Sequence, residues 1–225
     1  MTPDPKRRRS RQGGSALLEF AVVFPCLTVM FFGSVGLGVM LGRYIQAVQV
    51  CRDVAHMYAD KSIDFTQTAM QNIVTQKLAY GVGMTNTGGN GVVILSRIVT
   101  VYQADCTANG VSTCTNKNQP VITQRVTIGN TALYSSYFGT PSSSLLDSSG
   151  NITATNYMTN SSLRAANFET LLDDAVQRAT GTTPSPPAQA EGESSYMVEV
   201  YFTYPDIGFL GWTTSGGAYV RFAFQ

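Results

Sequence analysis

The sequence predicts an α+β protein, in which an N-terminal transmembrane and stalk helix leads into a small antiparallel β-sheet head packed with two further helices. Three observations predict this class. The 23 residues from Phe20 to Gly42 carry no charge. Apolar residues then keep helical spacing to about residue 60. Beyond residue 91, segments rich in β-branched residues alternate with a period of two.

The uncharged run is long enough to cross a bilayer. At about 1.5 Å per residue it covers roughly 34 Å as a helix, against a hydrocarbon core of about 30 Å. A cleaved secretory signal is the alternative, but its apolar region is shorter and no A-x-A site ends this one. The positive-inside rule places residues 1–14 in the cytoplasm and the chain after about Arg43 outside.

The basic residues are confined to the N-terminus. Residues 1–14 carry a net charge of +4, so the remaining residues carry −3 of the total of +1. A basic patch for nucleic acid is the alternative interpretation of this cluster. Its position directly before an apolar run favours a membrane role, and the acidic remainder predicts no nucleic-acid partner.

Helical spacing continues beyond the span as a stalk of about four turns, through Ile45, Val48, Ala55 and Tyr58. Asp64 and Gln67 stand at capping-box spacing and predict the start of a second helix. This helix passes through residues 70–78, and Gly81 and Gly83 end it. A third helix is predicted within residues 161–181, capped at Ser161 or Ser162 and stopped at Gly181.

Four segments have the composition of strands. They are residues 92–104, 121–128, 196–204 and 218–225. Their single apolar face requires a covering layer, which the second and third helices can provide. The Ser-, Thr- and Asn-rich residues 140–161 and the Pro-rich residues 182–194 are expected to be exposed loops.

The sequence offers little for catalysis, and we expect no enzyme, no cofactor and no catalytic or metal-binding residue. The single histidine, His56, falls on the stalk helix without a nucleophile motif to serve. Asp173 and Asp174 point in different directions from a helix and are expected to be a solvated face, while Glu191 and Glu193 have only a weak prospect of holding a cation.

The cysteines and the tryptophan have structural interpretations. Cys106 and Cys114 lie eight positions apart in a polar stretch and are expected to form a disulfide in an oxidising compartment. Cys26 and Cys51 are expected to be small buried hydrophobic residues. Trp212 either fills a small core or belongs to an exposed contact patch, and the first is favoured.

The N-terminus resembles that of a known family. A basic leader, Gly13-Gly14 and the stretch SALLEFAVVFP resemble the start of TadE-like pseudopilins, minor pilin-like proteins of the tight-adherence (Tad/Flp) pilus and a branch of the type IV pilin superfamily. The resemblance implies cleavage after Gly14, so that Ser15 becomes the new N-terminus and Glu19 its fifth residue. The Gly-rich GSVGLGVMLG departs from the leucines that the family tends to carry there.

The resemblance implies a domain plan and a role. Residues 1–14 would be a cleaved cytoplasmic leader, residues 15–60 the transmembrane and stalk helix, and residues 61–225 the extracytoplasmic α+β head. The chain would be a substrate of a prepilin peptidase, held in the inner membrane as a single-pass protein or incorporated in a surface pilus. Its partners would be the peptidase, the assembly platform, other pilin subunits and the lipid bilayer.

A second function class stays open. A membrane-tethered binding module that keeps its N-terminal anchor would also combine one span with an extracytoplasmic head. The acid at residue 19 favours the pseudopilin, because a carboxylate at the centre of a bilayer costs about 2.5–3.5 kcal/mol and a plain signal anchor gains nothing from it.

Overall fold

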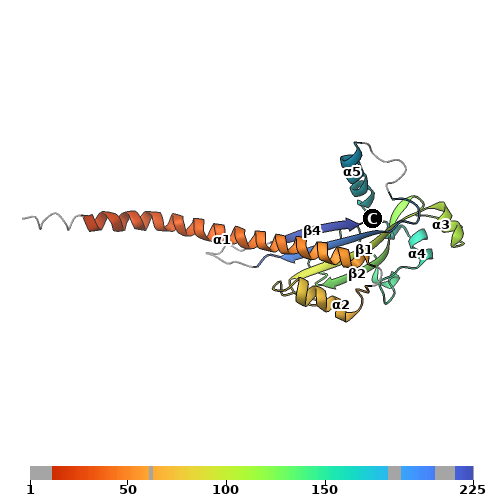
Figure 1. Ribbon diagram of the computed structural model, residues 1–225, viewed down its shortest axis with the longest axis horizontal. Coiled ribbons are helices and arrows are strands. Elements are labelled where there is room, and N and C mark those ends of the chain that lie inside the picture. The colour runs from red at the N-terminus through yellow and green to blue at the C-terminus, as the bar shows by residue number, and fades with distance from the viewer. Residues whose placement is uncertain (1–11, 61–62, 182–188, 206–215, 225) are drawn as a thin grey trace, which may run out of the picture. The chain divides into compact units, whose positions relative to one another are not determined.

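Figure 1 shows the computed structural model, which describes residues 12–60, 63–181, 189–205 and 216–224. Two compact units divide the chain: one contains the N-terminal helix as far as Gly42, and the other, which we call the head, begins at Arg43. The predicted α+β class is confirmed, since one long N-terminal helix precedes a four-stranded antiparallel sheet and several short helices.

Helix α1 runs from Gln12 to Ala59, and its 48 residues include Pro25. The predicted span and the predicted stalk are therefore one unbroken helix. A proline within a membrane helix is tolerated where its surroundings compensate for the lost hydrogen bond. Helix α1 belongs to both units, because the boundary between them falls at residue 42.

The head is built on four strands in the order β2-β1-β3-β4, with every neighbouring pair antiparallel. The strands are β1 (Gly91–Val101), β2 (Gln119–Gly129), β3 (Ser195–Thr203) and β4 (Gly217–Phe224). Each of the four predicted strands is found, with its limits moved by one to three residues. A bulge at Thr123 shifts the register of β2 against β1, because Arg97 pairs with Gln124 and Ile98 with Ile122.

One face of the sheet is covered by the last turns of α1 together with the segment that follows it. The α1 residues buried there are Ala47, Val50, Cys51, Val54, Ala55 and Tyr58. They pack on Val93, Leu95, Val198 and Val200 of the two central strands. The residues expected to form a stalk are thus part of the core, and the head takes in residues before position 61.

The predicted second helix differs in detail from the structure. It consists of α2 (Thr68–Asn72) followed by a single stretch of π-helix, Ile73–Leu78. Asp64 does not cap α2; its carboxylate instead accepts hydrogen bonds from Thr66 and Gln67, which close a turn ahead of the helix. The helix ends at Leu78 with Ala79 as its C-cap, slightly before the predicted glycines; Gly81 and Gly83, with positive φ angles of 79° and 77°, lie in the turn that follows.

The other face of the sheet carries a second core around Ile98, Ile122 and Met197, covered by Phe138, Leu163 and Phe168. Helix α5 (Phe168–Thr180) contributes to this cover and ends at Gly181, as predicted. Its predicted start was wrong. Residues 161–163 form a separate 3-10 turn, and Asn167, with a left-handed φ of 59°, separates it from α5.

Two predicted segments contain helices that their composition did not indicate. The end of the predicted strand 92–104 turns into α3 (Gln103–Ala108), and α4 (Ala154–Thr159) interrupts the predicted loop 140–161. That loop also lies along the outer edge of β2, where Arg125 N–H donates to Gly150 O over 2.8 Å and Ile152 N–H to Thr123 O over 2.9 Å. It thereby pairs an edge that would otherwise be open to other chains.

Candidate functional site

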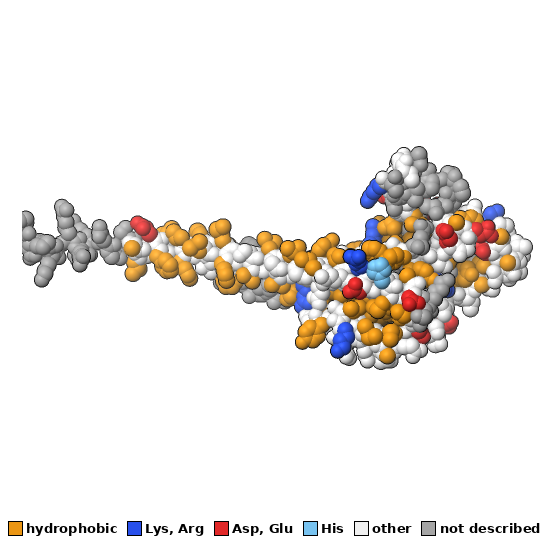
Figure 2. Space-filling view, in the orientation of Figure 1, with side chains coloured by type: hydrophobic (Ala, Val, Ile, Leu, Met, Phe, Trp, Pro, Cys, Tyr) orange, Lys and Arg blue, Asp and Glu red, His pale blue; other side chains and the backbone are white. Residues whose placement is uncertain are grey.

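The first candidate site is the apolar part of α1. Large hydrophobic side chains stand exposed along it on every side, and the most exposed of them include Leu17, Leu18, Met30 and Leu37, at 68–73%. Figure 2 shows these side chains in orange along the helix. Among the described residues, α1 is the one helix long and apolar enough to cross a membrane. An apolar surface of this extent is unfavourable in water and suits lipid.

The predicted processing residues lie at the beginning of this helix. Gly14 and Ser15 are in the first turn of α1, and Glu19 follows as an exposed residue. The five-residue separation between Gly14 and Glu19 corresponds to about 7.5 Å along the axis. The first four N–H groups of a helix have no intrahelical acceptor, so the backbone of this turn is held by fewer hydrogen bonds than the rest of α1. Residues 1–11 of the predicted leader lie outside the described residues.

The glycines of the span pack against no part of the chain that the structure describes. A Cβ added at Gly33, Gly36, Gly38 or Gly42 would meet no atom within 4 Å. Close helix packing through Gly38 and Gly42 therefore remains a prediction about another helix.

The free cysteines differ from each other. Cys51 is fully buried, as expected, and its thiol donates to Val198 O over 3.4 Å. Burial, with a smaller effect of the Glu199 charge, raises the pKa of the Cys51 thiol to about 12. Cys26 was expected to be buried and is exposed instead, because the most apolar stretch of α1 is not covered by other residues that the structure describes.

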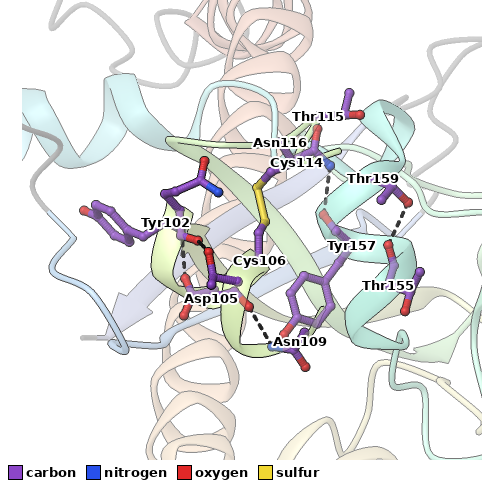
Figure 3. Close-up of a disulfide and its surroundings, with 12 residues drawn as sticks. Tyr102, Asp105, Cys106, Asn109, Cys114, Thr115, Asn116, Thr155, Tyr157 and Thr159 are labelled. Atoms are coloured by element: carbon purple, nitrogen blue, oxygen red, sulfur yellow. Dashed lines mark hydrogen bonds between the residues drawn. A yellow bond between two sulfur atoms is a disulfide. The ribbon is translucent and has the colours of Figure 1, made fainter. Parts of the chain in front are cut away.

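The predicted disulfide between Cys106 and Cys114 is present, with 6.0 Å between the two Cα atoms (Figure 3). Cys106 lies on α3 and is buried against Val101, Val121 and Met158. Around it, Tyr102 N–H donates to Asp105 Oδ2 over 2.7 Å. The disulfide thus fixes the loop that joins the ends of β1 and β2.

A buried polar network was missed by the sequence analysis. Glu199 of β3 is only 1% exposed, and its carboxylate accepts hydrogen bonds from the Ser136 hydroxyl, from Tyr137 N–H at 3.0 Å and from the Tyr219 hydroxyl at 2.8 Å. Nearby, Arg125 Nη2 donates to Gly139 O over 2.7 Å. Burial lowers the pKa of the Arg125 guanidinium to about 10, an effect that the Glu199 charge opposes.

The geometry of this network indicates a structural role. Its side chains hold the segment 136–139 against the sheet, and Arg221 adds a cation over the Tyr137 ring, 5.1 Å from the centroid. The available signal was the single acid in the apolar strand YMVEVYFTY. A charge at such a position is either a solvated residue or a buried one with several partners, and the sequence did not decide between them.

The remaining candidate residues stand apart from one another. His56 is exposed and packs its ring 4.9 Å from that of Phe224. Asp174 is exposed, Asp173 is half-buried, and Glu193 accepts a hydrogen bond from Ala190 N–H at 3.1 Å. No cluster of three or more His, Cys, Asp or Glu side chains suited to a metal occurs within the described ranges. Trp212 lies outside them.

These features first define a class of protein: one N-terminal helix suited to a bilayer, followed by a folded α+β head with a disulfide. Residues 14–56 match the model of a family described as TadE-like protein, so the resemblance seen in the N-terminal residues is confirmed for this segment. The match covers the apolar helix and the start of the head, and it does not extend to the sheet. No curated protein and no solved structure matches the chain.

Proposed function

We propose that this chain is a minor pilin-like subunit for assembly of a Tad/Flp-type adhesive pilus, and that a prepilin peptidase cleaves it between Gly14 and Ser15. The observation that carries the proposal is the extent of the TadE-like match. It begins at residue 14, the glycine before the proposed cut, and includes Glu19 and the whole apolar span. In this proposal the chain is the substrate of the peptidase and is not itself an enzyme.

The proposal gives the acid in the apolar helix a physical role. Before cleavage, Glu19 lies about 7.5 Å from Gly14 along the axis, close to the cytoplasmic interface, where a charge costs less than at mid-membrane. Cleavage creates a positively charged α-amine on Ser15. A pair between that amine and Glu19 of a neighbouring subunit would set the register between two helices, the best supported use of polar groups in apolar surroundings.

The head then faces the outside of the inner membrane and supplies contacts with other subunits and with the assembly platform. The exposed apolar surface of α1 supports this arrangement, since packing against lipid or other pilin helices removes it from water. The packing of the last turns of α1 on the sheet supports it too, because the sheet is thereby attached directly to the helix that the machinery holds.

The N-terminus of the mature protein tests the proposal. In cells with an active prepilin peptidase, mass spectrometry of the membrane-extracted protein is expected to show a chain that starts at Ser15. Gly14→Ala is expected to block cleavage. Glu19→Ala is expected to leave cleavage intact and to reduce incorporation into pili, while Glu169→Ala, at an exposed position of the head, is the matched control.

A chain that still starts at Met1 in such cells would contradict the proposal. It would favour the second candidate, a membrane-tethered extracytoplasmic binding module that keeps its anchor. Cleavage at Ser15 with no change in piliation on deletion would contradict the assembly role alone.

A further inference from the structure

We propose that four residues at the start of the head, Arg43, Tyr44, Lys77 and Tyr80, form a lipid-binding collar for the headgroup region of an anionic bilayer. This inference concerns the head and does not depend on cleavage of the leader. All four side chains belong to the head unit, and two of them come from a segment more than thirty residues beyond the span.

The collar is fixed next to the end of the apolar run by three hydrogen bonds. Arg43 Nη2 donates to Gly81 O over 2.8 Å, and Arg43 Nη1 donates to Gln46 Oε1 over 3.0 Å. Gln46 Nε2 in turn donates to Tyr80 O over 2.6 Å. The turn after the π-helix is therefore tied to the first turn of α1 beyond Gly42, the last residue of the uncharged run.

The same turn displays Tyr80 outwards. Its neighbours Ala79 and Val82 are buried, at 1% and 2% exposed, and they hold the backbone on the core. Tyr80 is 79% exposed, the largest value among the large hydrophobic side chains described, and Tyr44 is 47% exposed. Tyrosine side chains with an apolar ring and a polar hydroxyl favour the membrane interface, where both parts are satisfied.

The two chain segments that carry these rings contribute only positive charge. Arg43 is the single charged residue between Phe20 and Cys51, and Lys77 is the single charged residue between Phe65 and Gly91. Neither segment contributes a carboxylate that would repel phosphate. Lys77 is exposed, and long basic side chains near the end of a span reach headgroup phosphates while their stems stay in apolar surroundings.

The direct connection between the apolar span and the collar favours lipid as its binding partner. Arg43 follows Gly42 directly, so a helix inserted as far as Gly42 places Arg43 at the membrane interface. The turn at Tyr80 and Gly81 is hydrogen-bonded to Arg43 and Gln46 and therefore lies there too. A soluble protein partner would have to displace lipid there. Anionic lipid satisfies both the aromatic rings and the two cations.

Depth measurement on the full chain, with its leader intact, tests the inference. A single-tryptophan protein, Trp212→Phe with Tyr80→Trp, is reconstituted in phosphatidylcholine bilayers with and without phosphatidylglycerol, and the acyl chains carry bromine close to the headgroup. We expect loss of tryptophan fluorescence through bromine quenching. The matched control is Trp212→Phe with Lys117→Trp, an exposed site at the other end of β1, about 33 Å away for an 11-residue strand.

Quenching of residue 80 no stronger than that of residue 117 would overturn the collar. The charge is tested with Lys77→Gln. One basic residue near an anionic surface changes a binding constant by about fivefold, so we expect phosphatidylglycerol to deepen the quenching of residue 80 and Lys77→Gln to remove that gain. Equal quenching in both bilayers would overturn the assignment to anionic headgroups.

Discussion

Glu199 and Cys51 show how a single residue depends on the whole head. Glu199 lies on β3, and Cys51 lies on the face of α1 that packs on the sheet. The Glu199 charge contributes to the high pKa of the Cys51 thiol. Glu199 is tolerated inside because three donors satisfy its carboxylate, whereas Cys51 is tolerated because it stays neutral. Removing the donors around Glu199, or ionising Cys51, would lower the free energy of unfolding, because a buried polar group would then lack a partner.

The raised pKa of Cys51 predicts a loss of stability at alkaline pH. The unfolded chain releases the thiol proton near its ordinary value of 9.0, and the folded chain keeps it to about 12. Between these values the unfolded state binds fewer protons, so the free energy of unfolding falls as pH rises, by up to about 1.4 kcal/mol per pH unit. Urea unfolding of the head between about pH 8 and pH 11 measures this slope.

Cys51→Ala is expected to be less stable at neutral pH and to have a flatter alkaline slope. Part of the slope will remain, because burial also raises the pKa of the Tyr58 and Tyr219 hydroxyls. Cys26→Ala serves as the control and keeps the full slope. An unchanged slope in Cys51→Ala would contradict the assignment.

Sequence alone reached some of these residues and not others. The pairing of Cys106 with Cys114 was accessible because two cysteines in a short polar stretch have few other partners. The burial of Glu199 was not, since its donors Ser136, Tyr137 and Tyr219 lie 20–63 residues away and none has a pattern of its own. The proposed cleavage residues Gly14 and Ser15 belong to a motif that is contiguous in sequence, so predicting them needed no fold, and they stay a prediction.

The elements of the head divide in the same way. The four strands were predicted because a period of two is imposed by the pleat on each strand separately. The start of α5 was misplaced because the stripe through Leu163 and Phe168 continues across the break at Asn167. Both residues are buried in one cluster, so apolar spacing could not distinguish one helix from two segments.

The loop closed by Cys106 and Cys114 gives a prediction at this scale. Cys106→Ala with Cys114→Ala removes the covalent closure between the ends of β1 and β2. For a loop of this size we expect a loss of about 2–3 kcal/mol in the free energy of unfolding. Thermal unfolding with and without reductant measures it: reductant should lower the midpoint of the native protein and leave the double variant unchanged. A midpoint that reductant does not alter would contradict a stabilising role.

At the scale of the whole molecule, α1 serves two environments with two surfaces. As far as Gly42 its apolar side chains are exposed, and the described residues cover none of the most apolar stretch. From Arg43 onwards it buries one face on the sheet. Sequence periodicity predicted a helix throughout, but could not show that its last turns pack on strands, because Val198 and Val220, which contact Cys51, lie 147 and 169 residues beyond it.

This arrangement predicts where an independently folded head begins. A chain that starts at Arg43 is expected to fold, whereas one that starts at Ile63 lacks six buried α1 residues and leaves the sheet face uncovered. Near-ultraviolet circular dichroism and thermal unfolding distinguish them: a cooperative transition is expected only for the longer chain. Equal cooperativity of both chains would show that the α1 contacts are dispensable.

The buried face of α1 also sets an order in time. Cys51 contacts Val198, which is made 147 residues later, and synthesis at about 5–20 residues per second separates them by roughly 7–30 s. Throughout that interval the N-terminal part of α1 can already be in the bilayer, while the apolar residues of its last turns are not yet covered by β3 and β4. The last turns of α1 are thus synthesised early but reach their native contacts only when the C-terminal strands are made. During that interval a chaperone or the membrane surface can cover their apolar side chains.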